Sequence, residues 1–343
     1  MAGRSLITLG FAGFVALGLP EGAFGVAWPS MAEDFDQPIS RLGVLLVALV
    51  VGYFVASALT GWTTARLGVG STLVASSAIS AGALVGFAVA PVWPVLVLAV
   101  VVLGVGTALI DAGLNAHTAL HGGPRVMHLL HASFGIGATV GPLVMALFLA
   151  APGSWRGGFA VFGLIQAFLA VGFLRTRDRW GSTHPAPAAG TRPGFTGAIV
   201  SGLVLFAVYT GLEVAAGQWA YSVLTEDRGV AEGPAGLWVA GYWASLTIGR
   251  LAAGAAGDRL SPERLIVVGG ATALAGTLVF WIATPLGAGG VGLLLIGFGL
   301  APVFPMLVLV TPERVGPEHS TAVVGYQLAA AAVGAAVLPG TIG

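Results

Sequence analysis

PVLVLAVVVLGVGTALIDAGLNAHT, residues 94–118, is a continuous apolar run in which Asp111 is the one charged side chain. A helix that crosses about 30 Å of hydrocarbon needs about 20 predominantly apolar residues. This stretch is long enough and apolar enough to be a transmembrane helix. Other apolar runs of about this length are therefore expected to be transmembrane helices as well.

Similar runs recur along the chain, and about eleven membrane spans are expected on grounds of length and hydropathy. They cover residues 6–28, 43–64, 71–90, 94–118, 129–150, 157–175, 197–224, 235–256, 264–284, 288–310 and 319–341. The connections average about ten residues, which is too short for a soluble domain. The fold class is thus predicted to be an all-α polytopic membrane protein.

The amino-acid composition also indicates a protein that is embedded in a lipid bilayer. Of 343 residues, 57% are hydrophobic and only 8% are charged, and the mean hydropathy is +0.94. Soluble proteins carry about 25% charged residues, so an ordinary soluble enzyme, a disordered chain and a nucleic-acid binder are excluded. All 14 basic residues are arginine and there is no cysteine. A lysine Schiff base, a Walker-type lysine and a thiolate metal site are therefore ruled out, and we expect no enzyme, no cofactor and no metal.

Arginine placement predicts the orientation. If the N-terminus is cytoplasmic, about ten arginines fall on the cytoplasmic side, which is the side that basic residues favour. The opposite side then holds only Arg41, Arg156 and Arg228. The N-terminus is therefore expected in the cytoplasm, with the chain in the inner or plasma membrane.

One connection is long, polar and rich in proline and glycine: TRDRWGSTHPAPAAGTRPGFT, residues 176–196. It reads as a cytoplasmic linker between an N-terminal six-helix bundle, residues 1–175, and a C-terminal bundle of about five helices, residues 197–343. A weak repeat agrees, because GWTTARLGVG (61–70) and GAAGDRLSPERL (254–265) follow the second and the eighth span. The alternative is that small-residue turns ending in arginine are simply common at cytoplasmic helix ends.

These two turns resemble the Gly-x-x-x-Asp-Arg signature loop of the major facilitator superfamily. The second copy keeps Gly254, Asp258 and Arg259, whereas the first has Arg66 preceded by Ala65 where the acid belongs. The resemblance implies a fold of two bundles whose loops make charge contacts between them.

Three further motifs, GLPEGAFGVAWPSM (18–31), DAGLNAH (111–117) and LLHASFGIGATVGP (129–142), resemble the branch related to the fucose:proton symporters. Proteins of this superfamily have twelve transmembrane helices, and the present chain ends at Gly343, after the eleventh. We therefore expect helix twelve to be missing relative to these proteins, which would place the C-terminus outside the cell.

Three acids lie inside predicted spans: Glu21, Asp111 and Glu213. An ionisable group at this depth costs at least about 2.5–3.5 kcal/mol, so each is a candidate functional residue. The alternative is that each acid pairs with an arginine and stabilises packing. Only Arg250 is placed to do so, and three acids cannot share one base, so some are expected to bind a proton at neutral pH. In the resembled branch, acids on helices one and four serve proton coupling and substrate contact, and Glu21 and Asp111 match those places.

His131 opens the fifth span near Phe134, where it either relays a proton or packs in the helix bundle. His117, His121 and His128 surround GGPR (122–125) and are expected in an interfacial loop. No carboxylate accompanies them, so a metal site is not expected.

Polar and aromatic side chains inside the spans are candidates for substrate binding, since an aromatic face can stack on a sugar ring or hold a cation. Helix packing is the alternative for each. The candidates are Asn115, Phe134, Tyr209, Gln218, Trp219, Tyr242, Trp243 and Gln327.

Prolines within spans are candidates for gating, because they remove a backbone hydrogen bond and allow bending. Pro142 ends a Gly-x-x-x-Gly-Pro motif that is often linked with antiporters of the resembled superfamily, and Pro302 and Pro305 fall in the tenth span.

Together these features predict a secondary transporter that takes up a small polar, sugar-like solute with protons by alternating access. The alternatives are proton-coupled efflux of a drug or metabolite and a truncated relative without transport activity. The expected partners are the solute, protons and the lipid bilayer, with no nucleic acid, and a monomer is expected.

Overall fold

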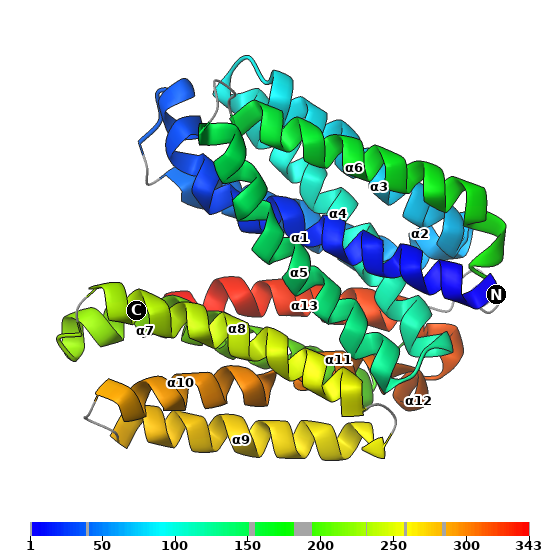
Figure 1. Ribbon diagram of the computed structural model, residues 1–343. Helices are drawn as coiled ribbons and strands as arrows, with labels where there is room; N and C mark the ends of the chain where they lie inside the picture. Colours follow the sequence, from blue (N-terminus) through cyan, green and yellow to red (C-terminus); the bar gives the residue numbers. More distant parts are fainter. Residues whose placement is uncertain are drawn as a thin grey trace. The chain divides into compact units, whose positions relative to one another are not determined.

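The computed structural model describes residues 2–38, 41–150, 155–181, 194–230, 232–256, 259–282 and 286–342. The long helices, drawn in Figure 1, are α1 (Ala2–Asp34), α2 (Leu42–Leu67), α3 (Val69–Val89), α4 (Trp93–His121), α5 (Pro124–Ala150), α6 (Trp155–Thr176), α7 (Gly197–Ser222), α8 (Glu232–Ala256), α9 (Pro262–Ile282), α10 (Leu286–Leu300) and α13 (Pro317–Ile342). Two short helices, α11 (Val303–Leu309) and α12 (Thr311–Val315), join α10 to α13.

Ten of the predicted spans each coincide with one helix, and the prediction of an all-α membrane protein is confirmed. The tenth span consists of α10 and α11, which are separated at Ala301 and Pro302. Ten helices of the described residues are long and apolar enough to cross a bilayer. The remaining predicted span corresponds to α8, which has 25 residues but is not among these ten.

The chain forms two compact units. Unit 1 comprises Met1–His117, Ser133–Pro193 and Pro317–Ala329. Unit 2 comprises Thr118–Ala132, Gly194–Gly316 and Ala330–Gly343. Consequently α5 and α13 each contribute one part to either unit. The predicted bundles 1–175 and 197–343 stay a prediction, and residues 182–193 of the predicted linker lie outside the described residues.

The centre of unit 1 is a buried aromatic cluster. Phe24 of α1, Phe87 of α3 and Phe159 of α6 lie with their ring centroids 4.9–5.6 Å apart. Tilted and edge-on rings at these separations add specific attraction to the burial of apolar area. This cluster joins three helices that are far apart in the sequence.

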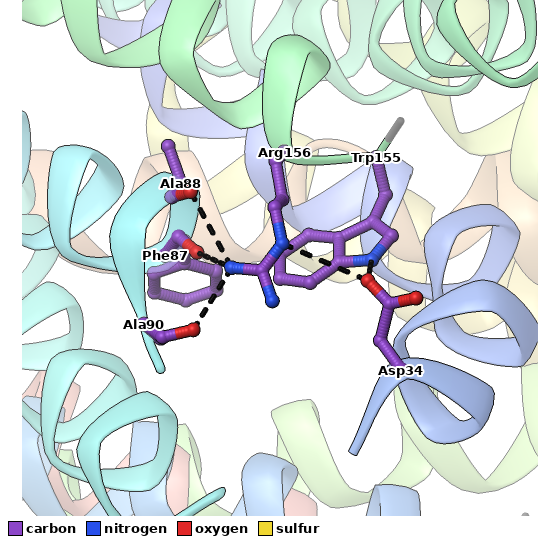
Figure 2. Close-up of polar contacts among 6 residues, drawn as sticks. All are labelled: Asp34, Phe87, Ala88, Ala90, Trp155 and Arg156. Atoms are coloured by element: carbon purple, nitrogen blue, oxygen red, sulfur yellow. Dashed lines mark hydrogen bonds and ion pairs between the residues drawn. The ribbon is translucent and has the colours of Figure 1, made fainter. Parts of the chain in front are cut away.

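Polar contacts of Trp155 and Arg156 with Asp34 and with the end of α3 hold one end of the same three helices together (Figure 2). We call these contacts the polar knot. Arg156 donates from Nη1 to the carbonyl oxygens of Phe87, Ala88 and Ala90 at the end of α3, at 3.4, 3.4 and 2.9 Å. Its Nε lies 3.6 Å from Oδ2 of Asp34, the last residue of α1. The last carbonyls of a helix have no partner within the helix, so Arg156 satisfies acceptors that α3 leaves open.

Trp155 completes this knot. Its Nε1 donates to Asp34 Oδ2 at 2.7 Å, and its ring lies 4.4 Å from the guanidinium carbon of Arg156. Adjacent residues at the start of α6 thereby fix the end of α1 by one neutral and one charged donor.

Glycines allow α1 and α5 to pack with their backbones in contact. A Cβ on Gly22 of α1 would collide with the backbone of Ala138, and one on Gly137 of α5 would collide with the carbonyl oxygen of Val15. Small residues at a helix interface are typical of membrane proteins, in which close van der Waals packing drives association. The sequence interpretation of the α5 glycines as positions of close helix approach agrees with this geometry.

Large apolar side chains point away from the protein interior in both units. Phe168 of α6, Trp281 of α9 and Leu147 of α5 are 76%, 79% and 72% exposed. Soluble proteins rarely expose extended apolar surface of this kind, so these faces are suited to contact with the hydrocarbon of a lipid bilayer.

Candidate functional site

Asp111 lies in unit 1 with both carboxylate oxygens engaged. Asn115, one turn later on α4, donates from Nδ2 to Oδ1 at 2.7 Å. The hydroxyl of Tyr53 on α2 donates to Oδ2. Asn115 is fully buried, whereas Asp111 and Tyr53 are half-buried. The pairing of Asp111 with Asn115 follows from helical spacing, but Tyr53 reaches it from a different helix.

Glu21 of α1 lies within electrostatic range of both Asp111 and Tyr53. Glu21 is exposed at the surface that the described residues form. Within those residues no ion pair joins Glu21 or Asp111 to an arginine. The structure therefore brings two predicted proton-coupling acids together, along with the predicted binding residue Asn115. We call Glu21, Tyr53, Asp111 and Asn115 the acid cluster.

The acid cluster can bind and release a proton. An ionised carboxylate accepts hydrogen bonds at both oxygens, as Asp111 does here, whereas a protonated one must donate from one of them. A proton on Asp111 thus turns one oxygen into a hydroxyl donor and weakens that oxygen as a hydrogen-bond acceptor.

A second ionisable group of residues lies in unit 2. Glu213 of α7 and Arg250 of α8 form an ion pair in which Arg250 Nη2 lies 3.4 Å from Glu213 Oε1. Their side chains are only 13% and 10% exposed. The sequence singled out Arg250 as the base able to pair with an intramembrane acid, and the structure pairs it with Glu213.

Two tyrosines surround this pair, and both direct their hydroxyls at backbone carbonyls. Tyr242 of α8 donates to the carbonyl oxygen of Glu213 at 2.7 Å. Tyr209 of α7 donates at 2.9 Å to the carbonyl oxygen of Leu300, the last residue of α10. Both are buried, so their roles in substrate binding stay predictions while their contacts join α7 to α8 and to α10.

Two histidines of α5 face the same region. His131 is 7% exposed and packs edge-on against Phe304 of α11, with centroids 5.2 Å apart. His128 is fully buried, and its Cβ lies 3.4 Å from the position of a Cβ on Gly254 of α8. Both imidazoles lie within electrostatic range of Arg250. The expectation that His117, His121 and His128 lie in an interfacial loop is wrong. His117 lies on α4, which ends at His121, and α5 begins at Pro124 and carries His128 into the core. We call Glu213, Arg250, His128 and His131 the arginine cluster.

The other predicted binding residues lie on α5, α7, α8 and α13. Trp219 donates from Nε1 to the carbonyl oxygen of Pro339 at 2.9 Å, so its indole joins α7 to α13. Trp243 is 41% exposed beside Tyr242. Gln327 is buried in α13 and Phe134 is half-buried in α5. The side chain of Gln218 lies outside the described residues.

The predicted loop and gating residues are only partly described. Arg66 and Arg259 are exposed, and Arg66 lies over the ring of Trp62 at 4.5 Å. Gly254 is buried, while Asp258 lies outside the described residues. The loop contacts between bundles stay a prediction.

The tenth span is interrupted where the prolines predict bending. Pro302 lies in the break between α10 and α11, and Pro305 is buried within α11. Pro142 lies within α5, but its side chain is outside the described part of the chain. Gating by these three prolines stays a prediction.

Tyr53 is the contact that sequence reasoning missed. It lies at Asp111 because α2 and α4 pack through Gly52 and Gly104, each of which leaves room only for the backbone of the other helix. A tyrosine inside an apolar span was visible in the sequence, but its partner was not. Among the described residues, no group of three or more His, Asp or Glu side chains could hold a metal ion.

The comparisons with known proteins fit this architecture. The family model described as Major Facilitator Superfamily matches residues 10–339. An uncharacterized transporter of Sinorhizobium fredii, y4wD, is 26% identical over 313 residues, which cover 86% of this chain and 79% of that protein.

Solved structures agree at the level of the fold. The Escherichia coli fucose:proton symporter FucP superimposes with a TM-score of 0.77 at 14% identity, covering 98% of this chain and 90% of that chain. The human organic anion transporter TETRAN gives a TM-score of 0.77 at 18% identity, covering 98% of this chain and 92% of that chain. At these identities the likeness shows a common fold.

Proposed function

This chain belongs to the Major Facilitator Superfamily and is a multi-pass membrane transporter rather than an enzyme, and on that premise we propose that it takes up a small polar solute together with protons. The proposal depends on the acid cluster of unit 1. Sugar-like solutes fit the resemblance to the fucose:proton symporters, to which the fold is similar.

The single observation that carries the proposal is the placement of Asp111. Its carboxylate is held by Tyr53 of α2 and Asn115 of α4, and Glu21 of α1 lies in electrostatic range. An intramembrane acid that is not neutralised by an arginine is expensive to retain, which makes a functional role the default explanation. Three helices therefore meet at a group that can exchange a proton.

A proton on Asp111 alters the contact between helices as well as the charge. Because the protonated oxygen becomes a donor and accepts less strongly, the hydrogen bond from Tyr53 or that from Asn115 is weakened. The contact from Tyr53 joins α2 to α4, so its weakening loosens that pair. In alternating access, such a change biases the transporter toward one of its two states.

Glu213 and His131 are proposed as further proton-binding groups in unit 2, where Arg250 accompanies them. We also propose that the N-terminus is cytoplasmic, that the protein resides in the cell membrane, and that it works as a monomer with two bundles.

Uptake into proteoliposomes under an imposed pH gradient tests proton coupling. We expect the gradient to drive accumulation of solute in the wild type and not in Glu21→Gln. Glu33→Gln, an exposed acid on the same helix, is the matched control and should transport normally. Equal uptake with and without the gradient would overturn the proposal.

Proton-driven efflux is the second candidate, favoured by the α5 motif that ends at Pro142 and by the close packing of its glycines on α1. The direction of flux separates the two. A symporter moves solute into the compartment that receives protons, whereas an antiporter moves it the opposite way under the same gradient.

A further inference from the structure

Arg250 of unit 2 is a buried cation with few hydrogen-bond partners among the described residues. The residue is 8% exposed, and a guanidinium carries five N–H donors. Its contact with Glu213 is a single one of 3.4 Å, whereas charge-assisted pairs are commonly bidentate and about 2.7–2.9 Å long. Its Nε is buried and has no hydrogen-bond partner among the described residues.

His128 of α5 also has buried polar atoms without a hydrogen-bond partner among the described residues. Both of its ring nitrogens are buried without a hydrogen-bond partner in the part of the chain that the structure describes. The Cβ of His128 lies 3.4 Å from the position of a Cβ on Gly254, one turn after Arg250 on α8, and the imidazole is within electrostatic range of that arginine. Buried polar atoms without partners are rare and call for an occupant that satisfies them.

In the described residues, Arg250 is paired with one carboxylate, that of Glu213. The hydroxyls of Tyr209 and Tyr242 donate to backbone carbonyls. One carboxylate thus faces a guanidinium with five donors. An incoming carboxylate brings up to four lone-pair positions and a negative charge, which is what a guanidinium and an imidazole N–H lack here.

We propose that Arg250 and His128 bind the anionic group of the transported solute, so that this transporter carries small carboxylate-bearing molecules. The inference rests on the proposed function for the existence of a transported solute and adds its chemical class. Glu213 is then the internal counter-ion, which holds Arg250 when the solute is absent and competes with the solute's carboxylate.

A purely structural ion pair makes the opposite prediction for Glu213. If the pair served only packing, removing the acid would leave Arg250 uncompensated and weaken the protein without creating affinity for anions. If Glu213 competes with the solute, removing its charge must tighten anion binding.

The test is a binding titration on the purified full-length protein in lipid nanodiscs, with glucuronate and glucose as matched probes that differ by one carboxylate. We expect the wild type to bind glucuronate at least about tenfold more tightly than glucose, and Glu213→Gln to bind glucuronate about tenfold more tightly than the wild type. Arg228→Gln, which alters another arginine of unit 2, is the matched control and should leave both affinities unchanged.

Arg250→Gln should lose the preference for glucuronate. Because this variant leaves Glu213 buried without its partner, the double variant Arg250→Gln/Glu213→Gln is measured beside it, and we expect that variant to be folded and to bind neither probe preferentially. Equal affinities of the wild type for both probes, or weaker glucuronate binding in Glu213→Gln, would overturn the inference.

Failure here is distinct from failure of proton coupling. Gradient-driven uptake of glucose without any preference for glucuronate would leave the proposed function standing and refute the anion site. Preferential glucuronate binding, together with uptake that does not depend on the pH gradient, would support the anion site and refute proton coupling.

Discussion

The hydroxyl of Tyr53 on α2 donates a hydrogen bond to Asp111 on α4, across 58 positions of sequence. With Asn115 at the other oxygen, this contact leaves the carboxylate fully engaged. The proton-binding behaviour of Asp111 and the packing of α2 on α4 therefore depend on one another.

Removing this hydroxyl should move the pH dependence of transport. A donor favours the ionised carboxylate, so in Tyr53→Phe the acid retains its proton to higher pH. The pH of half-maximal uptake is expected to rise by about one unit, which corresponds to one charge-assisted hydrogen bond. Uptake into proteoliposomes across a pH series measures this. Thr63→Val removes a hydroxyl that bonds only within α2, to Leu59, and an equal shift in that control would contradict the assignment.

Alanine at Gly22 should weaken the packing of α1 on α5. The new Cβ meets the backbone of Ala138, which cannot move aside as a flexible side chain can, and overpacking of this kind costs about 1–3 kcal/mol. Gly25, three residues later on the same helix, has open space around it. Gly25→Ala should be neutral or stabilising by about 0.5–1 kcal/mol, since alanine is the better helix former. Thermal unfolding in detergent compares the two, and similar losses in both would refute the close approach.

The knot at Asp34 should contribute modestly to stability. Asp34→Ala removes the acceptor of Trp155 and the counter-ion of Arg156. Because these charged side chains are 43% and 29% exposed, solvent screens the ion pair, and we expect a loss of about 1 kcal/mol. The midpoint of thermal unfolding should fall by about 1–2 °C. Glu33→Ala changes the neighbouring exposed acid, and its midpoint should stay at the wild-type value.

The absence of cysteine makes the orientation directly measurable by single cysteine substitutions. Arg41 and Arg259 are both exposed and fall on opposite sides in the predicted topology. A membrane-impermeant maleimide should label Arg41→Cys in intact cells and Arg259→Cys only after permeabilisation. The inverse labelling pattern would place the N-terminus outside.

The membrane helices were predictable from the sequence because span length and hydropathy depend on the bilayer, not on tertiary contacts. Likewise, Asn115 follows Asp111 by one helical turn, so their pairing is a local property of α4. The break before α11 was visible as Pro302. The predictions succeeded where one helix contained all the information.

Contacts between helices were harder to predict from the sequence than features within one helix. Nothing in the spacing along α2 places Tyr53 at Asp111, because that depends on how two helices align at Gly52 and Gly104. His128 was assigned to a loop because it follows a Gly-Gly-Pro turn, although α5 begins at Pro124 and buries the imidazole. Rotation and depth of a helix are set by its neighbours and not by its own pattern.

The way α5 and α13 are shared between the units has a consequence for any attempt to divide the protein. Unit 1 is completed by Pro317–Ala329 from near the C-terminus, and unit 2 by Thr118–Ala132 from the first half of the chain. A polypeptide severed between residues 182 and 193 would give two fragments, each of which holds a piece that the other needs. Such fragments should be recovered as stable protein only when they are synthesised together in one cell.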